Sequence, residues 1–383
     1  MKILKTLKKA SKWVLIIAFG LVIILYLTDY NYILKGVRVV YLTGHITAFI
    51  DDYTYFENED IPASTLPQPW PIHENYNSVV ATEALSEVNK KLGTIAFLII
   101  KNDSIWFENY AENYSKDSQT NSFSMAKSIT SALLGKAIHD GFINSLEQPV
   151  SDFYPQFANS GMTVGDLSSM ASGLNWDESY KSPFSVTARS YYDNDLAETI
   201  LNLKVVDTPG KHYKYLSGNT ELLGMVIQKA IQKPLAKYLS ESFWQPMGAE
   251  NPALWQVDDK VNRLVKSYCC IASNARDFAR FGKLYKDNGK WNRQRLLDSS
   301  FVATSVYPRF EESPQYGYGF WLSDYLEKKI FVMRGILGQY VITIPEDNLI
   351  IVRLGHNRGD KTGTPFTSDF YTYVEEVYNM LPD

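Results

Sequence analysis

The sequence predicts an α+β fold, in which an antiparallel sheet is formed by both ends of the chain and flanked by helices. Strand-like segments cluster around residues 94–110 and again around residues 318–354, whereas the region between them is mostly helical with long loops. An unbroken apolar run near the N-terminus lies outside this arrangement. Two groups of strands separated by helices are typical of one sheet that carries a mostly helical second region.

Length and composition indicate a globular protein that does not bind nucleic acid. The chain has 383 residues, of which 45% are hydrophobic, and it contains no low-complexity tract. Its formal net charge is −4, although the first twelve residues carry five lysines and no acidic residue. The remainder is therefore more acidic than the whole, and it offers no basic run to meet the phosphates of a nucleic acid.

The N-terminal segment predicts a membrane anchor. An apolar run of 15 residues, from Trp13 to Leu27, follows the five lysines. A membrane-spanning helix needs about 20 apolar residues, and the core of a signal peptide has about 7–15. Thr28 begins a polar segment with no small-x-small cleavage site and no lipid-acceptor cysteine, which favours an uncleaved helix over residues 1–28. A cleaved signal peptide is the alternative.

The lysines also predict the orientation of this anchor. Basic flanking residues stay in the cytoplasm, so we expect a single-pass protein of the inner cell membrane. The rest of the chain then lies on the extracytoplasmic, periplasmic side.

Residues 29–93 are predicted to connect this anchor to a hydrolase domain over residues 94–383. Four prolines crowd the stretch from Ile61 to His73. Proline fixes its own φ and disfavours helix at the preceding residue, so this stretch should be extended. We expect it to pack along the larger domain.

The elements predicted after residue 94 begin with a hairpin. Its strands occupy 94–101 and 104–110, around a turn at Asn102-Asp103. A helix is expected from Ser124 to His139, because Gly141 supplies a stop. Later strands are predicted over residues 318–322, 330–333, 339–344 and 349–354, and a closing helix over residues 366–380.

Ser124 and Lys127 form the first candidate catalytic pair. Residues i and i+3 of a helix share a face, so this hydroxyl and this amine can come within hydrogen-bond distance. A desolvated lysine loses its charge and can accept the proton of a serine nucleophile. The serine at the start of the helix would also present its own N–H to an oxyanion. The alternative is a capping serine followed by a surface lysine.

Further segments share a family pattern with this pair. They contain Tyr213-Lys-Tyr215-Leu-Ser217, Met333-Arg-Gly335, the Ser-Gly-Leu174 turn and Ala275-Arg-Asp-Phe-Ala-Arg-Phe-Gly282. Together they resemble the β-lactamase-related serine hydrolases, which include class C β-lactamases, D-Ala-D-Ala carboxypeptidases, esterases and nylon-oligomer (6-aminohexanoate-dimer) hydrolases. The resemblance implies a β-lactamase/transpeptidase-like fold and an acyl-enzyme mechanism without metal or organic cofactor.

The resemblance assigns roles only at matched positions. Ser124 matches the nucleophile, Lys127 the adjacent base, and Tyr215 the tyrosine of the family motif. Tyr215 is expected to act as a base that helps Lys127 take the Ser124 proton and then activates water for deacylation. The oxyanion would be held by the N–H of Ser124 and that of Ile336, after Gly335. Ser217 is expected near the leaving group.

Two departures affect the substrate class. Ser217 replaces the asparagine of the Tyr-x-Asn motif, and Met333 replaces the lysine of Lys-Thr-Gly. Both weaken an antibiotic-hydrolase interpretation and bring the sequence closer to nylon-oligomer hydrolases and esterases. Arg334 is the nearest alternative partner for a substrate carboxylate. Trp176 and Asp177 are candidates for the wall of the substrate groove.

These patterns leave a membrane-anchored amidase or esterase as the first hypothesis. A cell-wall carboxypeptidase or β-lactamase, and a non-catalytic sensor or binding protein, are the alternatives. A histidine triad is disfavoured because no Gly-x-Ser-x-Gly motif exists, and no metal-ligand spacing is present. The adjacent Cys269 and Cys270 are expected to be small core residues and not a disulfide. The sequence does not determine the natural substrate, the preference for amide or ester, or the oligomeric state.

Overall fold

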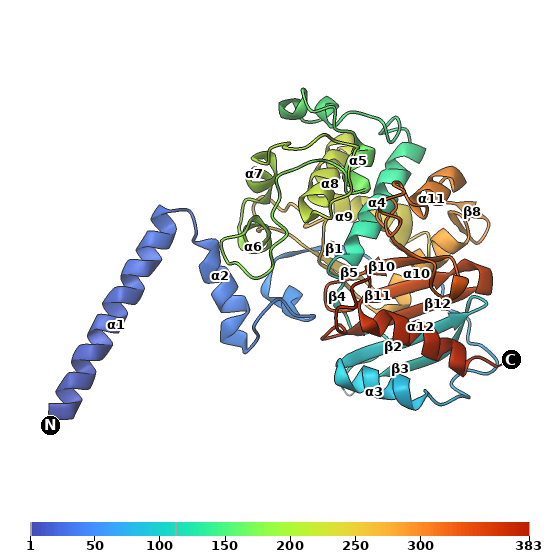
Figure 1. Ribbon diagram of the computed structural model, residues 1–383, viewed down its shortest axis with the longest axis horizontal. Coiled ribbons are helices and arrows are strands. Elements are labelled where there is room, and N and C mark those ends of the chain that lie inside the picture. Colours follow the sequence, from blue (N-terminus) through green and yellow to red (C-terminus); the bar gives the residue numbers. More distant parts are fainter. Residues whose placement is uncertain (1, 112, 383) are drawn as a thin grey trace.

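The computed structural model describes residues 2–111 and 113–382. A long helix, α1 (Lys2–Leu27), projects away from the remainder of the protein, where helices and a large sheet pack together (Figure 1). The segment Thr6–Leu27 of this helix is 22 residues long, has a mean hydropathy of 2.3 and is not buried against the rest of the chain. It is long and apolar enough to cross a membrane, although a signal sequence has the same properties.

The large sheet joins the two ends of the globular part, as the sequence predicts. It has six antiparallel strands in the order β3-β2-β12-β11-β10-β9. The hairpin strands and their C-terminal partners are β2 (Thr94–Lys101), β3 (Ser104–Tyr110), β9 (Trp321–Ser323), β10 (Ile330–Arg334), β11 (Tyr340–Ile344) and β12 (Leu349–Gly355). The predicted α+β fold is therefore confirmed.

Both faces of this sheet are covered by helices. Side chains alternate along β2, so Phe97 and Ile99 pack on one face with α12 (Ser368–Met380) and α3 (Glu83–Lys91). Leu98 and Ile100 belong to the core on the opposite face, where α10 (Ala275–Lys286) lies. This alternation explains why the central strands are apolar along their whole length.

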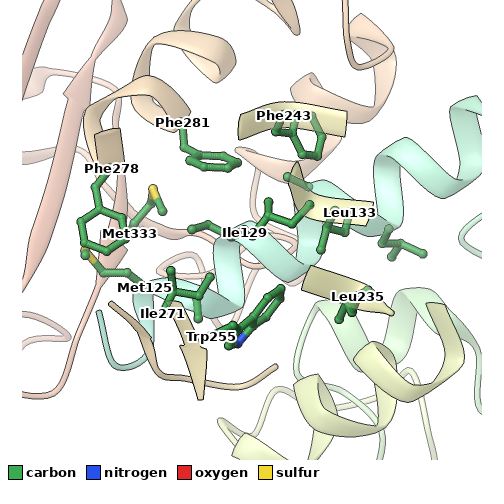
Figure 2. Packing of buried hydrophobic residues seen from close by; sticks show 14 of the residues in the cluster. Met125, Ile129, Leu133, Leu235, Phe243, Trp255, Ile271, Phe278, Phe281 and Met333 are labelled. Carbon is green, nitrogen blue, oxygen red and sulfur yellow. The ribbon is translucent and has the colours of Figure 1, made fainter. Parts of the chain in front are cut away.

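The larger core surrounds α4 (Met125–His139), which enters the interior between the sheet and the helical region. Met125, Ile129 and Leu133 lie on this helix and are fully buried. They pack in one cluster with Phe278 of α10 and Met333 of β10 (Figure 2). Most side chains of this helix are buried, and its buried hydroxyls on Ser128, Thr130 and Ser131 donate to backbone carbonyls of other segments.

The second region consists of short helices beside a small sheet. Its helices are α5 (Val164–Ser168), α6 (Val186–Tyr192), α7 (Leu196–Leu201), α8 (Ser217–Ile231), α9 (Leu235–Leu239) and α11 (Ser299–Ser305). The small sheet has the order β1-β5-β6-β4 and contains β1 (Asn58–Ile61), β4 (Thr120–Asn121), β5 (Ala253–Gln256) and β6 (Ile271–Ser273). A separate pair consists of β7 (Lys290–Trp291) and β8 (Gln294–Arg295).

The segment over residues 29–93 contributes secondary structure to the globular part. It contains α2 (Tyr32–Val39), β1 and α3, and β1 pairs with β5 in the small sheet. The proline-rich stretch packs along α10, where the Trp70 indole donates to the Arg276 carbonyl at 2.9 Å.

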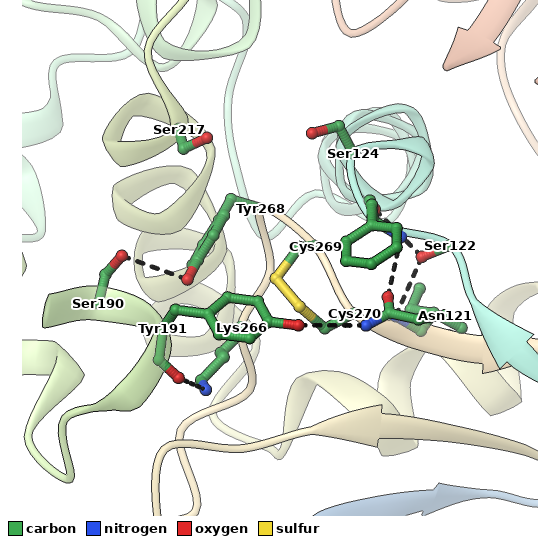
Figure 3. The surroundings of a disulfide bond; sticks show 12 residues. Asn121, Ser122, Ser124, Ser190, Tyr191, Ser217, Lys266, Tyr268, Cys269 and Cys270 are labelled. Atoms are coloured by element: carbon green, nitrogen blue, oxygen red, sulfur yellow. Dashed lines mark hydrogen bonds between the residues drawn. A yellow bond between two sulfur atoms is a disulfide. The ribbon is translucent and has the colours of Figure 1, made fainter. Parts of the chain in front are cut away.

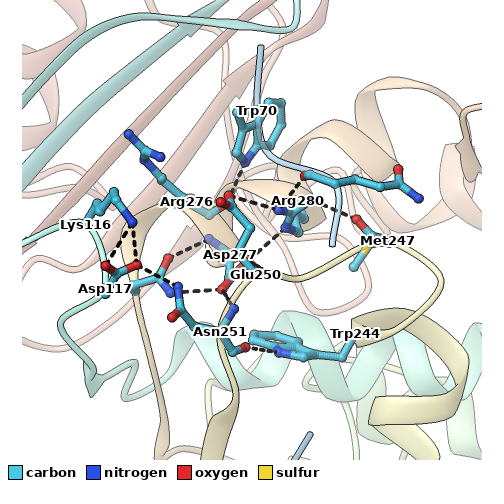
Figure 4. A network of polar contacts seen from close by, with 12 residues as sticks. Trp70, Lys116, Asp117, Trp244, Met247, Glu250, Asn251, Arg276, Asp277 and Arg280 are labelled. Carbon is cyan, nitrogen blue, oxygen red and sulfur yellow. Dashed lines mark hydrogen bonds and ion pairs between the residues drawn. The ribbon is translucent and has the colours of Figure 1, made fainter. Parts of the chain in front are cut away.

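A buried ion pair supports this packing. Arg280 donates to Asp277 at 2.8 Å and to the carbonyls of Gln68 and Met247 (Figure 4). The connecting segment is therefore attached to the same helix that covers the sheet.

Candidate active site

Ser124 lies at the start of α4, directly after the short strand β4. The neighbouring Ser122 fixes this turn, because its N–H donates to the Ile271 carbonyl at 2.8 Å and its Oγ accepts from Ile271 N at 3.1 Å. Phe123 has a φ of +45°, in the left-handed region that few non-glycine residues adopt. Such local strain is typical of functional turns, and here it places the Ser124 hydroxyl at the edge of a pocket.

Lys127 is buried and contacts three oxygen atoms. Its Nζ lies 3.0 Å from Ser124 Oγ, 3.1 Å from Ser217 Oγ and 2.9 Å from the carbonyl oxygen of Tyr268. Burial lowers the pKa of Lys127 to about 8, although the charges of Glu178 and Glu221 act to raise it. About a tenth of this amine is therefore neutral at pH 7, far more than for an exposed lysine.

Glu178 fixes the direction of the hydrogen bonds around this lysine. Ser217, the first residue of α8, donates its backbone N–H to one carboxylate oxygen of Glu178 and its hydroxyl to the other, each at 2.6 Å. A hydroxyl has one hydrogen, so Ser217 Oγ can only accept from Lys127. The Tyr268 carbonyl can also only accept.

The two hydrogens of a neutral Lys127 amine are therefore both used. The lone pair that remains can face Ser124, which is the arrangement a general base requires. The sequence argument gave neither Glu178 nor the Tyr268 carbonyl a role beside Lys127. The only signal was that Glu178 directly follows Trp176 and Asp177, which the sequence placed at the wall of the substrate groove.

Tyr215 completes the group around Ser124. It hydrogen-bonds the serine side chain, and its ring centroid lies 5.2 Å from Lys127 Nζ. Its ring also packs against Trp321, with the centroids 5.2 Å apart. Burial is the largest influence on its pKa and raises it well above the usual range. The phenol therefore stays protonated and can pass a proton on, but it is not a free phenolate base.

Two backbone N–H groups at the pocket are available to an oxyanion. Within the described residues, neither Ser124 N nor Ile336 N donates to a protein acceptor, and both residues line the pocket. The N–H of Gly335 is occupied, because it donates to the Gln339 carbonyl at 2.8 Å. A Cβ at Gly335 would lie 2.6 Å from the Ser122 carbonyl oxygen, which explains why glycine is needed there.

Trp176 and Asp177 lie near the site, but neither side chain lines the pocket. Trp176 is 2% exposed and packs behind the pocket wall, with its ring centroid 6.4 Å from that of Tyr268. Asp177 is exposed and accepts from the backbone N–H of Ser179 at 3.0 Å. The next residue, Glu178, is the one that reaches Ser217.

The pocket beside Ser124 is small and mainly apolar. Its volume is about 120 Å³, and its lining comes from distant parts of the chain: Thr47, Ala48, Phe123, Ser124, Ser179, Tyr180, Thr187, Ala188, Tyr191, Tyr192, Ser217, Tyr268, Cys269, Ile336 and Leu337. This lining contains no lysine or arginine. Among the described residues, no group of three or more His, Cys, Asp or Glu side chains is placed to hold a metal ion.

The two cysteines are buried as expected, but the expectation that they do not bridge is wrong. Cys269 and Cys270 are joined by a disulfide between adjacent residues, and Cys269 lines the pocket (Figure 3). Cys270 has a φ of +76°, and the pair directly follows Tyr268, whose carbonyl contacts Lys127. Adjacent cysteines bridge here because a buried loop holds the backbone in a form that brings both sulfur atoms together, which spacing along the sequence does not reveal.

The side chains of Met333 and Arg334 lie in different environments. Met333 is fully buried in the core beside α4 and does not line the pocket. Arg334 donates to the Pro365 carbonyl, and its guanidinium lies 5.0 Å from the centre of the Trp321 ring. The cation on this strand is thus held against aromatic side chains.

Comparison with known proteins places this fold and site in a family. The family model described as Beta-lactamase matches residues 81–365, about three quarters of the chain. The chain belongs to the beta-lactamase family. It is a β-lactamase-related serine hydrolase, and the resemblance drawn from its motifs is confirmed.

Individual relatives are distant. The 6-aminohexanoate-dimer hydrolase of Paenarthrobacter ureafaciens is 25% identical over 292 residues, which cover 68% of this chain and 72% of that protein. Protein flp of Staphylococcus aureus is 27% identical over 180 residues, covering 43% of this chain and only 35% of that protein.

Solved structures support the fold. A Bacillus anthracis protein assigned as a 6-aminohexanoate-dimer hydrolase superposes with a TM-score of 0.73 at 21% identity, covering 85% of this chain and 90% of that one. EstCE1, a hydrolase with promiscuous acyltransferase activity, gives a TM-score of 0.62 at 14% identity, covering 77% and 97% of the two chains.

Proposed function

We propose that this protein cleaves ester or amide bonds through an acyl-enzyme formed on Ser124, with neutral Lys127 as the general base. The observation that carries this proposal is the hydrogen-bond arrangement around Lys127. Ser217 and the Tyr268 carbonyl take both amine hydrogens, so the lone pair is directed to the Ser124 hydroxyl at 3.0 Å. The pKa of about 8 leaves this amine partly neutral at physiological pH.

Acylation begins as Ser124 Oγ attacks the substrate carbonyl carbon and its proton moves to Lys127 Nζ. The carbonyl oxygen becomes an oxyanion, which accepts from the N–H groups of Ser124 and Ile336. Lys127 then gives up the proton it took, and Tyr215, hydrogen-bonded to Ser124, relays it to the leaving alcohol or amine, so that Lys127 is neutral again. The bond to the leaving group breaks, and the acyl group stays on Ser124.

Deacylation repeats these steps with water. The water gives a proton through Tyr215 to Lys127, and its oxygen attacks the acyl carbon. A carboxylic acid leaves, Ser124 regains its proton, and no metal or organic cofactor takes part.

The relatives and the pocket favour linear esters or amides over lactam antibiotics. The similar proteins include a 6-aminohexanoate-dimer hydrolase and a hydrolase with acyltransferase activity. The pocket lining has no arginine or lysine to pair with a substrate carboxylate, and Arg334 is stacked on Trp321. Losing one charge-assisted hydrogen bond costs about 1.5–3 kcal/mol, which is roughly a ten- to hundred-fold handicap for a penicillin or cephalosporin.

The N-terminal helix supports a membrane-anchored enzyme. Five lysines precede the apolar run Trp13–Leu27, so the anchor would place the hydrolase domain on the extracytoplasmic side of the inner membrane. The helix is exposed along its apolar length, which costs free energy in water and is relieved in lipid.

A substrate panel tests the proposed activity. We expect wild-type protein to hydrolyse 4-nitrophenyl butyrate and a short linear amide far better than a D-Ala-D-Ala peptide or a chromogenic cephalosporin. The Ser124→Ala variant should hydrolyse none of them. A cephalosporin kcat/KM equal to that of the best ester would refute the substrate class.

A further inference from the structure

The end of α1 is attached to the helix that forms one wall of the pocket. Asp29 pairs with Arg189 of α6 at 2.7 Å, and the Arg189 guanidinium lies 4.8 Å from the centre of the Tyr32 ring. Tyr32 also donates to the Pro183 carbonyl at 2.9 Å. Ala188 and Tyr191, which lie close to Arg189 on the same helix, line the pocket. The exit of the anchor is thus held next to the catalytic pocket.

The chain that leaves the anchor then forms part of the pocket itself. Thr47 and Ala48 line it, and Thr47 comes 20 residues after the last residue of α1. Eight of these residues are coiled in α2, so the whole segment can span at most about 50 Å. Gly36 of α2 lies against the ring of Tyr192, another residue of the pocket lining. A Cβ at position 36 would lie 3.3 Å from that ring.

Large apolar side chains are exposed on the segments that lead to the pocket lining. Leu42 is 77% exposed and Ile46 is 87% exposed, and both belong to the segment between α2 and the pocket wall. Phe184 is 63% exposed and lies on the loop that holds Tyr32. These side chains, which we call the apolar rim (Leu42, Ile46 and Phe184), cost free energy in water unless another apolar phase covers them.

Aromatic residues follow the end of α1 on this side. Trp13 stands at the far end of the apolar run of α1 and Tyr26 at the end next to the body, as interfacial aromatic residues do in membrane helices. Tyr30 and Tyr32 follow directly and stack with Arg189. The lipid headgroups of the membrane would therefore lie at the junction of α1 with α6, beside the apolar rim.

We propose that the pocket opens toward the lipid bilayer and that the substrate is an acyl ester or amide residing in the membrane, whose acyl chain enters across the apolar rim. This inference rests on the proposed hydrolase function and on the anchor. The apolar lining around Phe123, Cys269 and Leu337 suits a hydrocarbon chain and offers it no charge. An ester dissolved in water reaches Ser124 without contacting the rim.

Kinetics on full-length protein reconstituted in phosphatidylcholine and phosphatidylglycerol vesicles test this inference. The two probes are 4-nitrophenyl butyrate, which stays in water, and 4-nitrophenyl laurate, which partitions into the vesicles. The test variant is Leu42→Ser/Ile46→Ser. The matched control is Leu66→Ser/Val80→Ser, because these side chains are similarly exposed, at 79% and 89%, and lie in the segment packed along the sheet side.

We expect the rim variant to lose roughly ten-fold in laurate hydrolysis, since two large apolar side chains no longer contact lipid or acyl chain. Its butyrate hydrolysis and that of the control should stay at the wild-type level. Equal effects on both esters, or no effect on laurate, would overturn the membrane-substrate inference while leaving the hydrolase proposal intact. A failure of the hydrolase proposal would give a different result, because the Ser124→Ala variant would then hydrolyse butyrate at the wild-type rate. The single variant Leu42→Ser, expected to show a smaller loss on laurate alone, guards against misfolding of the double variant.

Discussion

Replacing Glu178 by glutamine should move the pH dependence of catalysis to lower pH. Lys127 must be deprotonated to accept the Ser124 proton, so wild-type kcat/KM should rise with pH through about 8, the pKa of this amine. The carboxylate of Glu178 favours the charged ammonium and raises this pKa. Removing the negative charge therefore lowers the pKa of Lys127, and the rise in kcat/KM comes at lower pH.

The size of this shift follows from the distances. Ser217 Oγ lies 3.1 Å from Lys127 Nζ and 2.6 Å from Glu178 Oε1, so the two charges are within about 6 Å. Unit charges at that separation interact by about 3 kcal/mol at an effective dielectric of 20, or roughly two pH units. Because Glu178 is only half-buried, solvent screening reduces this, and we expect a shift on the order of one unit.

Measuring kcat/KM for 4-nitrophenyl butyrate from pH 5 to 10 separates this electrostatic effect from a structural one. Glutamine also frees the Ser217 hydroxyl, so the plateau rate should fall as well. The matched control is Asp177→Asn, which removes an exposed neighbouring carboxylate that is not among the charges acting on Lys127. A lower plateau with an unmoved pH midpoint, or a midpoint moved to higher pH, would refute the role of the Glu178 charge.

Four further predictions concern the nucleophile, the anchor, the disulfide and the core. Ser124→Ala should abolish labelling by a fluorophosphonate while leaving the melting temperature within a few degrees; persistent labelling would place the nucleophile elsewhere. Deleting residues 1–28 should give a folded, active enzyme in detergent-free buffer, because α1 is not buried against the body; aggregation of that form, alongside active full-length protein, would make α1 part of the fold. Protein denatured without reductant should react with no thiol reagent, and reduction should release the two thiols of Cys269 and Cys270; thiols found before reduction would contradict the disulfide. Met333→Lys, which sequence reasoning alone would use to improve lactam acylation, should instead destabilise the protein by several kcal/mol in urea unfolding, because it buries an unpaired amine in the core; unchanged stability would show that this side chain reaches the pocket.

Local patterns in the sequence determined the parts of the protein that depend on near neighbours. The hairpin over Thr94–Tyr110 has the predicted bounds, because alternating strands around Asn102-Asp103 define a two-residue turn. The Ser124–Lys127 contact follows from the pitch of one helix, which places residues three apart on the same face. The apolar run before Leu27 likewise needs no tertiary context to form α1.

Only the tertiary structure decided what surrounds that pair. Glu178, Ser217 and the Tyr268 carbonyl come from separate segments, and they meet at Lys127 because the helical region folds back onto α4. The same long-range packing closes the Cys269–Cys270 disulfide and turns Met333 into the core. The local repeat of a helix or strand determines on which face of that element a side chain lies. Which other segment packs against that face depends on how apolar surface is buried across the whole chain, and no local pattern records this.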